Sequence, residues 1–146
     1  MGYSKILCAV DFSPTAREAL RAASKLAVDN NAELTLVHVW QPPMYSFGPE
    51  APFPGSVLQD LISDAEKSLD AWVAEAKQLG AKRVKGEFMT GVAWDQVVEA
   101  LRRDNAYDLV VVGTHGRTGL KHVVLGSVAE KIVRHAPCAV LVVRSR

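Results

Sequence analysis

Several features that would place the chain in a specialised class of proteins are scarce or missing. Only two residues are cysteine, Cys8 and Cys138, and each lies inside an apolar run. We interpret both as small buried hydrophobic residues in a reducing compartment, because two cysteines cannot supply a disulfide framework. No pair of Cys or His residues has the spacing of a metal site. The sequence therefore indicates neither a disulfide scaffold nor a zinc domain.

An excess of charge of one sign is missing, and so are long apolar runs. There are 17 Lys and Arg residues against 16 Asp and Glu, so the composition points to neither nucleic acid nor an anionic membrane as partner. No apolar stretch is long enough to cross a bilayer. The N-terminus, MGYSKILCAVDF, lacks the layout of a signal peptide, and Ile6 breaks the myristoylation pattern. We therefore expect a soluble, cytoplasmic protein that binds neither nucleic acid nor membranes.

The chain has instead a regular alternation of predicted strands and helices. Its 146 residues fit one domain, and a hydrophobic fraction of 49% can supply a core. Apolar residues at helical spacing predict helices from Pro14 to about Asn31 and over 57–79, 93–103 and 127–135. Short apolar or alternating runs predict strands at 5–10, 33–40, 83–90, 108–113 and 138–143. Five prolines between residues 41 and 56 predict a long loop there.

This alternation predicts a single α/β domain over residues 1–146. The expected architecture is an open, doubly wound sheet of five parallel strands with helices on both faces. Ligands of such sheets bind beyond the carboxyl ends of the strands, at the point where the strand order reverses. In the order 3-2-1-4-5, that point lies between the ends of the first and fourth strands, next to Asp11 and Gly113.

The segment after the fourth predicted strand has the chemistry of an anion site. The stretch VVVGTHGRTGLKHVVLGSV, residues 110–128, contains four of the ten glycines. Glycine lets backbone N–H groups approach a phosphate closely. The segment has no Asp or Glu but carries Arg117 and Lys121. Its end opens a predicted helix, whose first N–H groups and positive dipole end favour an anion. We interpret the segment as a phosphate-binding site.

A purely structural interpretation of the same segment stays open. Gly113 would then end a strand, the two cations would be solvated, and Ser127 with Glu130 would form a capping box. The common nucleotide motifs G-x-x-x-x-G-K-[ST] and G-x-G-x-x-G are both missing. They therefore do not distinguish the phosphate-binding interpretation from the structural one. His115 has no catalytic partner that the sequence reveals, so we expect a structural or solvent-facing role for it.

The glycine spacing resembles a known family. The pattern G-x2-G-x9-G-[ST] is met by Gly113, Gly116, Gly126 and Ser127. Together with VDFSPTAREAL, LVHV and PCAVLVVR, it makes nearly the whole chain similar to the universal stress protein family. The resemblance implies an adenine nucleotide alpha hydrolase-like fold with strand order 3-2-1-4-5. It also implies a homodimer that binds ATP or a related nucleotide, AMP or cyclic AMP.

The resemblance assigns roles to the residues around the switch point. Asp11 would bind the ribose. The adenine would be framed by Ala9, Val10 and Val39, through backbone groups and apolar contact, and Val112 would line the pocket beside the first glycine.

The same resemblance assigns the phosphates to the glycine-rich segment. Backbone amides and the Ser127 hydroxyl would hold them, with Arg117 either reaching the outer phosphates or remaining a solvated cation. A Mg or Mn ion would bind through the phosphates with help from Asp11. The residues expected to supply amides are Gly113, Gly116, Gly126, Ser127 and Val128.

One carboxylate and a set of backbone amides favour holding a nucleotide over turning it over, so we predict no catalytic residue. The expected function is stress-response regulation, in which the nucleotide decides conformation or partner choice. A slow ATPase or phosphotransferase is one alternative, and a dimeric interaction module that does not bind nucleotides is another.

The last predicted strand, Cys138 to Val143, has no charged residue. We therefore predict that this strand is an edge of the sheet and lies at or near a two-fold dimer interface.

Overall fold

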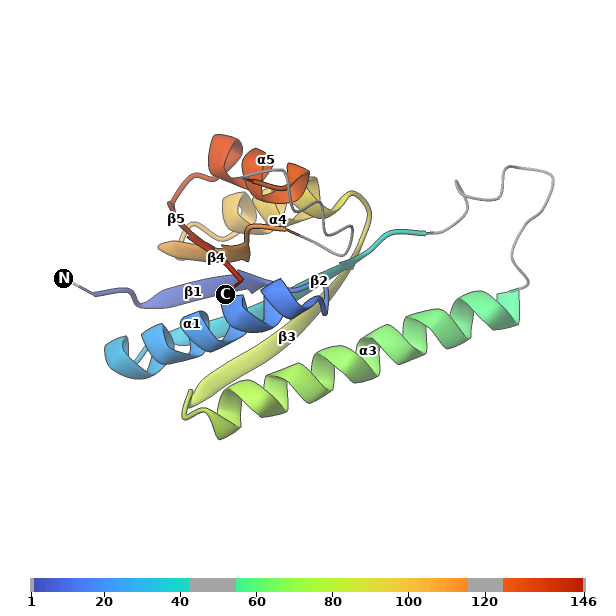
Figure 1. Ribbon diagram of the computed structural model, residues 1–146, viewed down its shortest axis with the longest axis horizontal. Helices are drawn as coiled ribbons and strands as arrows, with labels where there is room; N and C mark the ends of the chain where they lie inside the picture. The colour runs from blue at the N-terminus through green and yellow to red at the C-terminus, as the bar shows by residue number, and fades with distance from the viewer. Residues whose placement is uncertain (1, 43–54, 116–124, 146) are drawn as a thin grey trace.

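The structure is a computed structural model that describes residues 2–42, 55–115 and 125–145. Within these ranges the chain forms one parallel sheet in the order β3-β2-β1-β4-β5, which confirms the predicted topology (Figure 1). The strand ranges agree with the predicted ranges to within one residue at either end. They are β1 Lys5–Ala9, β2 Glu33–Trp40, β3 Arg83–Thr90, β4 Leu109–Gly113 and β5 Ala139–Val143.

Helices cover both faces of the sheet, as predicted (Figure 1). Helix α1 begins where the sequence indicates, because the Ser13 Oγ accepts the N–H of Ala16 at 3.1 Å and Pro14 occupies the first helical position. Its C-cap is Asn31, whose left-handed backbone closes the last turn. The helices are α1 Pro14–Asn30, α3 Gly55–Gln78, α4 Ala93–Arg103 and α5 Ser127–His135.

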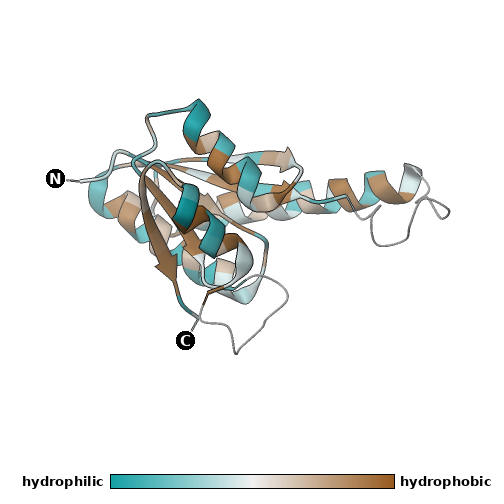
Figure 2. Cartoon of the chain, turned by 90° about the horizontal axis from the view of Figure 1, so that it is seen from above, coloured by the Kyte–Doolittle hydropathy of each residue, from teal (hydrophilic) through white to brown (hydrophobic). Residues whose placement is uncertain are grey.

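The side chains of each inner strand alternate between two hydrophobic clusters. In β1, Ile6 and Cys8 pack under α1 and α3, whereas Leu7 packs under α4 and α5. Burial raises the pKa of the Cys8 thiol to about 12, which fits the predicted core role. Cys138, expected to be buried as well, is only half-buried because it precedes an edge strand. Figure 2 shows strongly apolar strands in the sheet and helices of mixed hydropathy, whereas β3 also carries Arg83, Lys85 and Glu87.

Helix α3 reaches well beyond the sheet (Figures 1 and 2). It starts two residues before the predicted position and runs for 24 residues, yet its buried residues, Leu69, Trp72 and Ala76, all lie in the second half. That half is tied to α1 by Arg17, whose guanidinium contacts Glu75 at 2.6 Å and lies 4.7 Å from the centre of the Trp72 ring. Among the described residues, no helix combines the length and apolarity needed to cross a membrane.

Candidate functional site

Strands β1 and β4 end side by side at the point where the strand order reverses. Their register pairs Cys8 with Val111, so Asp11 and Thr114 each lie three residues beyond this pair. The chain then leaves β1 for α1 on one face, and it leaves β4 for α5 on the other. This divergence is the switch point at which ligands of doubly wound sheets bind.

Four of the predicted site residues meet on the face covered by α4 and α5. Val112 belongs to the hydrophobic cluster of that face, and Ala9, Val39 and Val128 pack against the same cluster. They come from the ends of three neighbouring strands and from the first turn of α5. These residues, distant in sequence, thus share one apolar cluster, and the partly exposed Ala9, Val39 and Val128 give it an apolar surface beside the buried Val112.

Val10 does not join this surface. Its side chain is 4% exposed and lies in the opposite cluster, under α1 and α3. Its N–H donates to the carbonyl of Val37 at 2.9 Å, and its own carbonyl lies 2.9 Å from Nδ1 of His38. A carbonyl can only accept, so that ring nitrogen carries the proton. The β-strand alternation of Ala9 and Val10 already separates the two residues onto different faces.

The turn after β1 holds Asp11 in a fixed position. One carboxylate oxygen of Asp11 accepts the N–H of Ser13 at 3.0 Å, which locks the chain into a tight turn before α1. Between them, Phe12 has a φ of 65°, a left-handed conformation that is unusual for a bulky residue. Its ring stacks on His38 at 4.4 Å and meets the edge of Trp72 at 5.2 Å, and these contacts hold the strained residue.

Gly113 is required by a close approach between β4 and α1. A Cβ at this position would lie 2.8 Å from Cγ2 of Thr15 and 3.2 Å from its backbone carbonyl atoms. The glycine therefore lets the first turn of α1 pack directly on the end of β4. The sequence interpretation of Gly113 as a plain strand end misses this contact, which joins residues distant in sequence.

Gly126 lies directly against the residue that follows β4, Thr114. A Cβ there would lie 2.9 Å from the carbonyl oxygen of Thr114, and the N–H of Gly126 donates to that same oxygen at 2.6 Å. The amide that the resemblance assigns to a phosphate is thus engaged within the protein. Thr114, a buried residue that the sequence did not single out, brings the start of α5 to the switch point.

The first turn of α5 offers the N–H groups expected of an anion site. The N-cap is Gly126, and the first bond within the helix runs from the N–H of Glu130 to the Gly126 carbonyl at 2.9 Å. The N–H groups of residues 127–129 therefore have no acceptor inside the helix. The alternative capping box does not form, because Ser127 is the exposed first helical residue and Glu130 pairs with Arg134.

Two of the predicted residues, Gly116 and Arg117, lie outside the described residues. His115, at the end of the described segment, is half-buried. Within the described ranges there is no group of three or more His, Cys, Asp or Glu residues able to hold a metal ion. Asp11 offers a carboxylate beside the switch point.

Comparison with known proteins identifies relatives along the whole chain. A model of the universal stress protein family matches residues 2–144. Universal stress protein A homolog 1 of Coxiella burnetii is 37% identical over 145 residues, which cover 98% of this chain and 97% of that protein. The structure of the universal stress protein UspA from Lactobacillus plantarum aligns with a TM-score of 0.83 at 26% identity, over 99% of both chains.

Three solved structures of the same fold contain an adenine nucleotide. They are a universal stress protein in complex with cAMP (TM-score 0.72, 24% identity, 100% of both chains), one from Archaeoglobus fulgidus with dAMP (0.69, 23%, 98% and 99%) and one from Arabidopsis thaliana with AMP (0.68, 19%, 98% and 92%). At these identities the likeness to this chain is one of fold.

Proposed function

The chain belongs to the universal stress protein family, and from that premise we propose that it binds an adenine nucleotide at the carboxyl ends of β1 and β4. The observation that carries the proposal is the meeting of Ala9, Val39 and Val128, all partly exposed, with the buried Val112 in one apolar cluster at the switch point. This surface lies where the chain also turns through Asp11 and enters α5.

The chemistry of the site suits the three parts of such a ligand. A flat adenine base needs an apolar surface, which the four residues supply. Ribose hydroxyls need an acceptor, and the Asp11 carboxylate, oriented by the N–H of Ser13, carries acceptor oxygens. A phosphate needs N–H donors, which the first turn of α5 supplies. The three neighbours that contain cAMP, dAMP or AMP bind ligands with this composition.

We propose ATP or a close relative as the ligand, with Mg²⁺ or Mn²⁺ held mainly by the phosphate oxygens. A single carboxylate, that of Asp11, suits such an ion, because Mg²⁺ commonly binds through one or two carboxylates together with substrate phosphates. The bound metal would neutralise phosphate charge. The donors present favour holding the nucleotide, so the proposed role is regulation of conformation or partner choice rather than rapid turnover.

Calorimetry with ATP, AMP and cyclic AMP tests the proposal. We expect saturable binding of at least one of the three, weakened by Asp11→Asn, which keeps an oxygen for Ser13 but removes the charge and one acceptor. The matched control is Asp29→Asn on the exposed end of α1, which should bind as the unchanged protein does. Failure of all three nucleotides to bind would contradict the proposal and favour the nucleotide-independent interaction module.

The slow ATPase alternative has its own measurement. Phosphate release from ATP should be undetectable, or at most very slow, in the purified protein. Steady turnover that disappears in Asp11→Ala would replace the binding role with an enzymatic one.

We propose further that two copies pair along β5. In the described sheet, β5 has a neighbour only on its β4 side, and Leu141 at its centre is 36% exposed. An uncharged edge strand of this kind can pair with a second copy. Sedimentation at micromolar concentration should give a dimer, and Leu141→Lys should give a monomer. Leu79→Lys, at a 47% exposed position beyond α3 near the other edge, is the control that should stay dimeric.

A further inference from the structure

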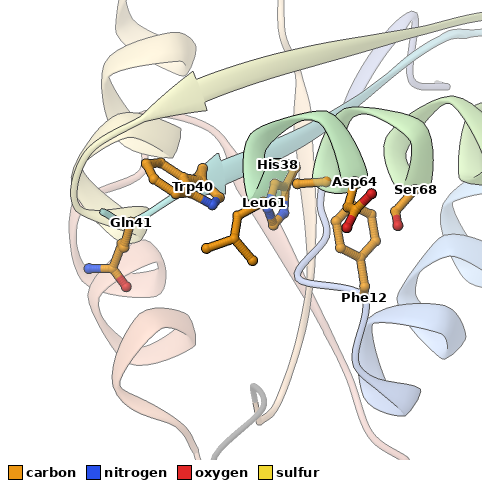
Figure 3. Close-up of a pocket in the computed structure, with 8 residues that line it drawn as sticks. Phe12, His38, Trp40, Gln41, Leu61, Asp64 and Ser68 are labelled. Atoms are coloured by element: carbon orange, nitrogen blue, oxygen red, sulfur yellow. The ribbon is translucent and has the colours of Figure 1, made fainter. Parts of the chain in front are cut away.

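A cavity lies on the face of the sheet opposite the proposed nucleotide site. It has a volume of about 310 Å³ and opens between the turn after β1, the end of β2 and the first half of α3 (Figure 3). Its walls include the rings of Phe12, His38 and Trp40, and Leu61, Asp64 and Ser68 project toward them from α3. This volume suits a small organic molecule.

The described lining of this cavity carries negative charge and no Lys or Arg. Among the described residues that line it, Asp64 is the only Asp, Glu, Lys or Arg. Its carboxylate forms no salt bridge with any described residue. Aromatic faces next to a carboxylate are the groups that bind organic cations, through the ring quadrupole and through charge-assisted hydrogen bonds.

We propose that this cavity is a second ligand site, and that it takes a small, flat organic cation such as an amidine or a protonated heteroaromatic amine. The flat part lies against the aromatic wall and the charged end meets Asp64. Inorganic anions and carboxylates are disfavoured, because the described walls contain no Lys or Arg to receive them.

The walls of this cavity connect it to the switch point. Phe12 directly follows Asp11, and His38 bonds to the carbonyl of Val10, directly before Asp11. A ligand that holds the stacked pair Phe12 and His38 also holds the turn that presents the Asp11 carboxylate. The cation therefore tightens nucleotide binding, a consequence that rests on the proposed nucleotide site.

Titration with benzamidine, a flat amidinium ion, tests the second site. In ¹⁵N-resolved NMR spectra, the amide of Phe12 and the indole N–H of Trp40 should shift in a saturable way. Benzoate, with the same ring and the opposite charge, should cause no saturable shift. Equal binding of benzoate, or shifts confined to other parts of the chain, would overturn the proposal.

Three substitutions on α3, one of them a control, sharpen the test. Asp64→Asn removes the charge at constant shape and should weaken benzamidine binding about tenfold. Asp60→Asn, one turn earlier and outside the cavity lining, should leave the affinity unchanged. Ala65→Leu fills part of the cavity with a good helix former and should prevent binding while the protein stays folded. Unchanged affinity in Asp64→Asn or Ala65→Leu would overturn the site.

The coupling is measured separately, by calorimetry of AMP binding with and without saturating benzamidine. We expect AMP to bind about fivefold more tightly with benzamidine present, and Asp64→Asn to lose this effect at the same benzamidine concentration. An AMP affinity that is the same with and without benzamidine would refute the coupling. It would not contradict the second ligand site, which the NMR titration tests. If AMP, ATP and cyclic AMP all fail to bind, the proposed nucleotide site fails, whereas the benzamidine result is independent of it.

Discussion

Ser127→Pro provides a way to remove one backbone amide from the proposed phosphate site without breaking α5. Proline lacks the N–H group but is well tolerated at the first helical position, which Ser127 occupies. The residue before a proline must be extended, and Gly126 already has φ −68° and ψ 163°. The substitution also removes the Ser127 hydroxyl, so Ser127→Ala is the reference that isolates the amide.

The expected size of the effect comes from the charge of the ligand. A hydrogen bond to a charged group contributes about 1.5–3 kcal/mol, so Ser127→Pro should bind the nucleotide roughly 10- to 150-fold more weakly than Ser127→Ala. The free energy of unfolding should change by less than about 0.5 kcal/mol, because this N–H has no acceptor within the helix.

Calorimetry measures the affinity, and urea unfolding measures the stability. Ala93→Pro is the matched control, since Ala93 opens α4 after Val92, whose φ of −80° and ψ of 124° are equally compatible with a following proline. It should leave nucleotide affinity unchanged. Equal affinities of Ser127→Pro and Ser127→Ala, with both proteins folded, would show that the amide of residue 127 does not contact the phosphate.

Three further predictions concern stability. Gly113→Ala places a Cβ 2.8 Å from a methyl of Thr15 and should cost about 1–3 kcal/mol in urea unfolding; a neutral change would show that α1 can shift away freely. Burial raises the pKa of Asp108, but the hydrogen bonds that it accepts from the backbone and a side chain at the start of β1 outweigh this, so the net pKa lies below the usual value. The folded carboxyl thus holds its proton less tightly than the unfolded one, and its contribution to stability is present above about pH 4 and lost as the pH falls through the folded pKa. Unfolding free energies from pH 6 to 2 should show an acid loss that is smaller in Asp108→Asn, and identical pH curves would contradict this origin. Ser24→Ala removes a fully buried hydroxyl that has no hydrogen-bond partner among the described residues and should stabilise the protein by about 1 kcal/mol, whereas destabilisation would reveal a partner.

The sheet could be predicted from the sequence because its signals are local. Apolar runs, the Ser13–Pro14 helix start and the alternation of strands with helices each depend on neighbouring residues. The prediction of the strand order 3-2-1-4-5 rests on the family resemblance, because right-handed crossovers alone leave several strand orders open. Strand alternation could also have predicted that the side chains of Ala9 and Val10 lie on opposite faces of the sheet, because successive residues of a strand point to opposite sides.

The parts that could not be predicted depend on contacts between distant segments. Gly113 packs on Thr15, about a hundred positions earlier in the chain, and no local pattern carries that requirement. Phe12 adopts a left-handed backbone because His38 and Trp72 hold its ring, whereas the residue type alone predicts the opposite. The cavity beside Phe12 likewise joins residues from three separate elements.

The most direct test of the nucleotide site is an NMR titration of the ¹⁵N-labelled protein with ATP and Mg²⁺. We expect saturable shifts at residues 9–12, at Val39, at residues 112–114 and at the first turn of α5, with the largest amide changes at Ser127 and Val128. No shifts, or shifts confined to the Trp40 and Asp64 cavity on the other face, would contradict a nucleotide site at the ends of β1 and β4.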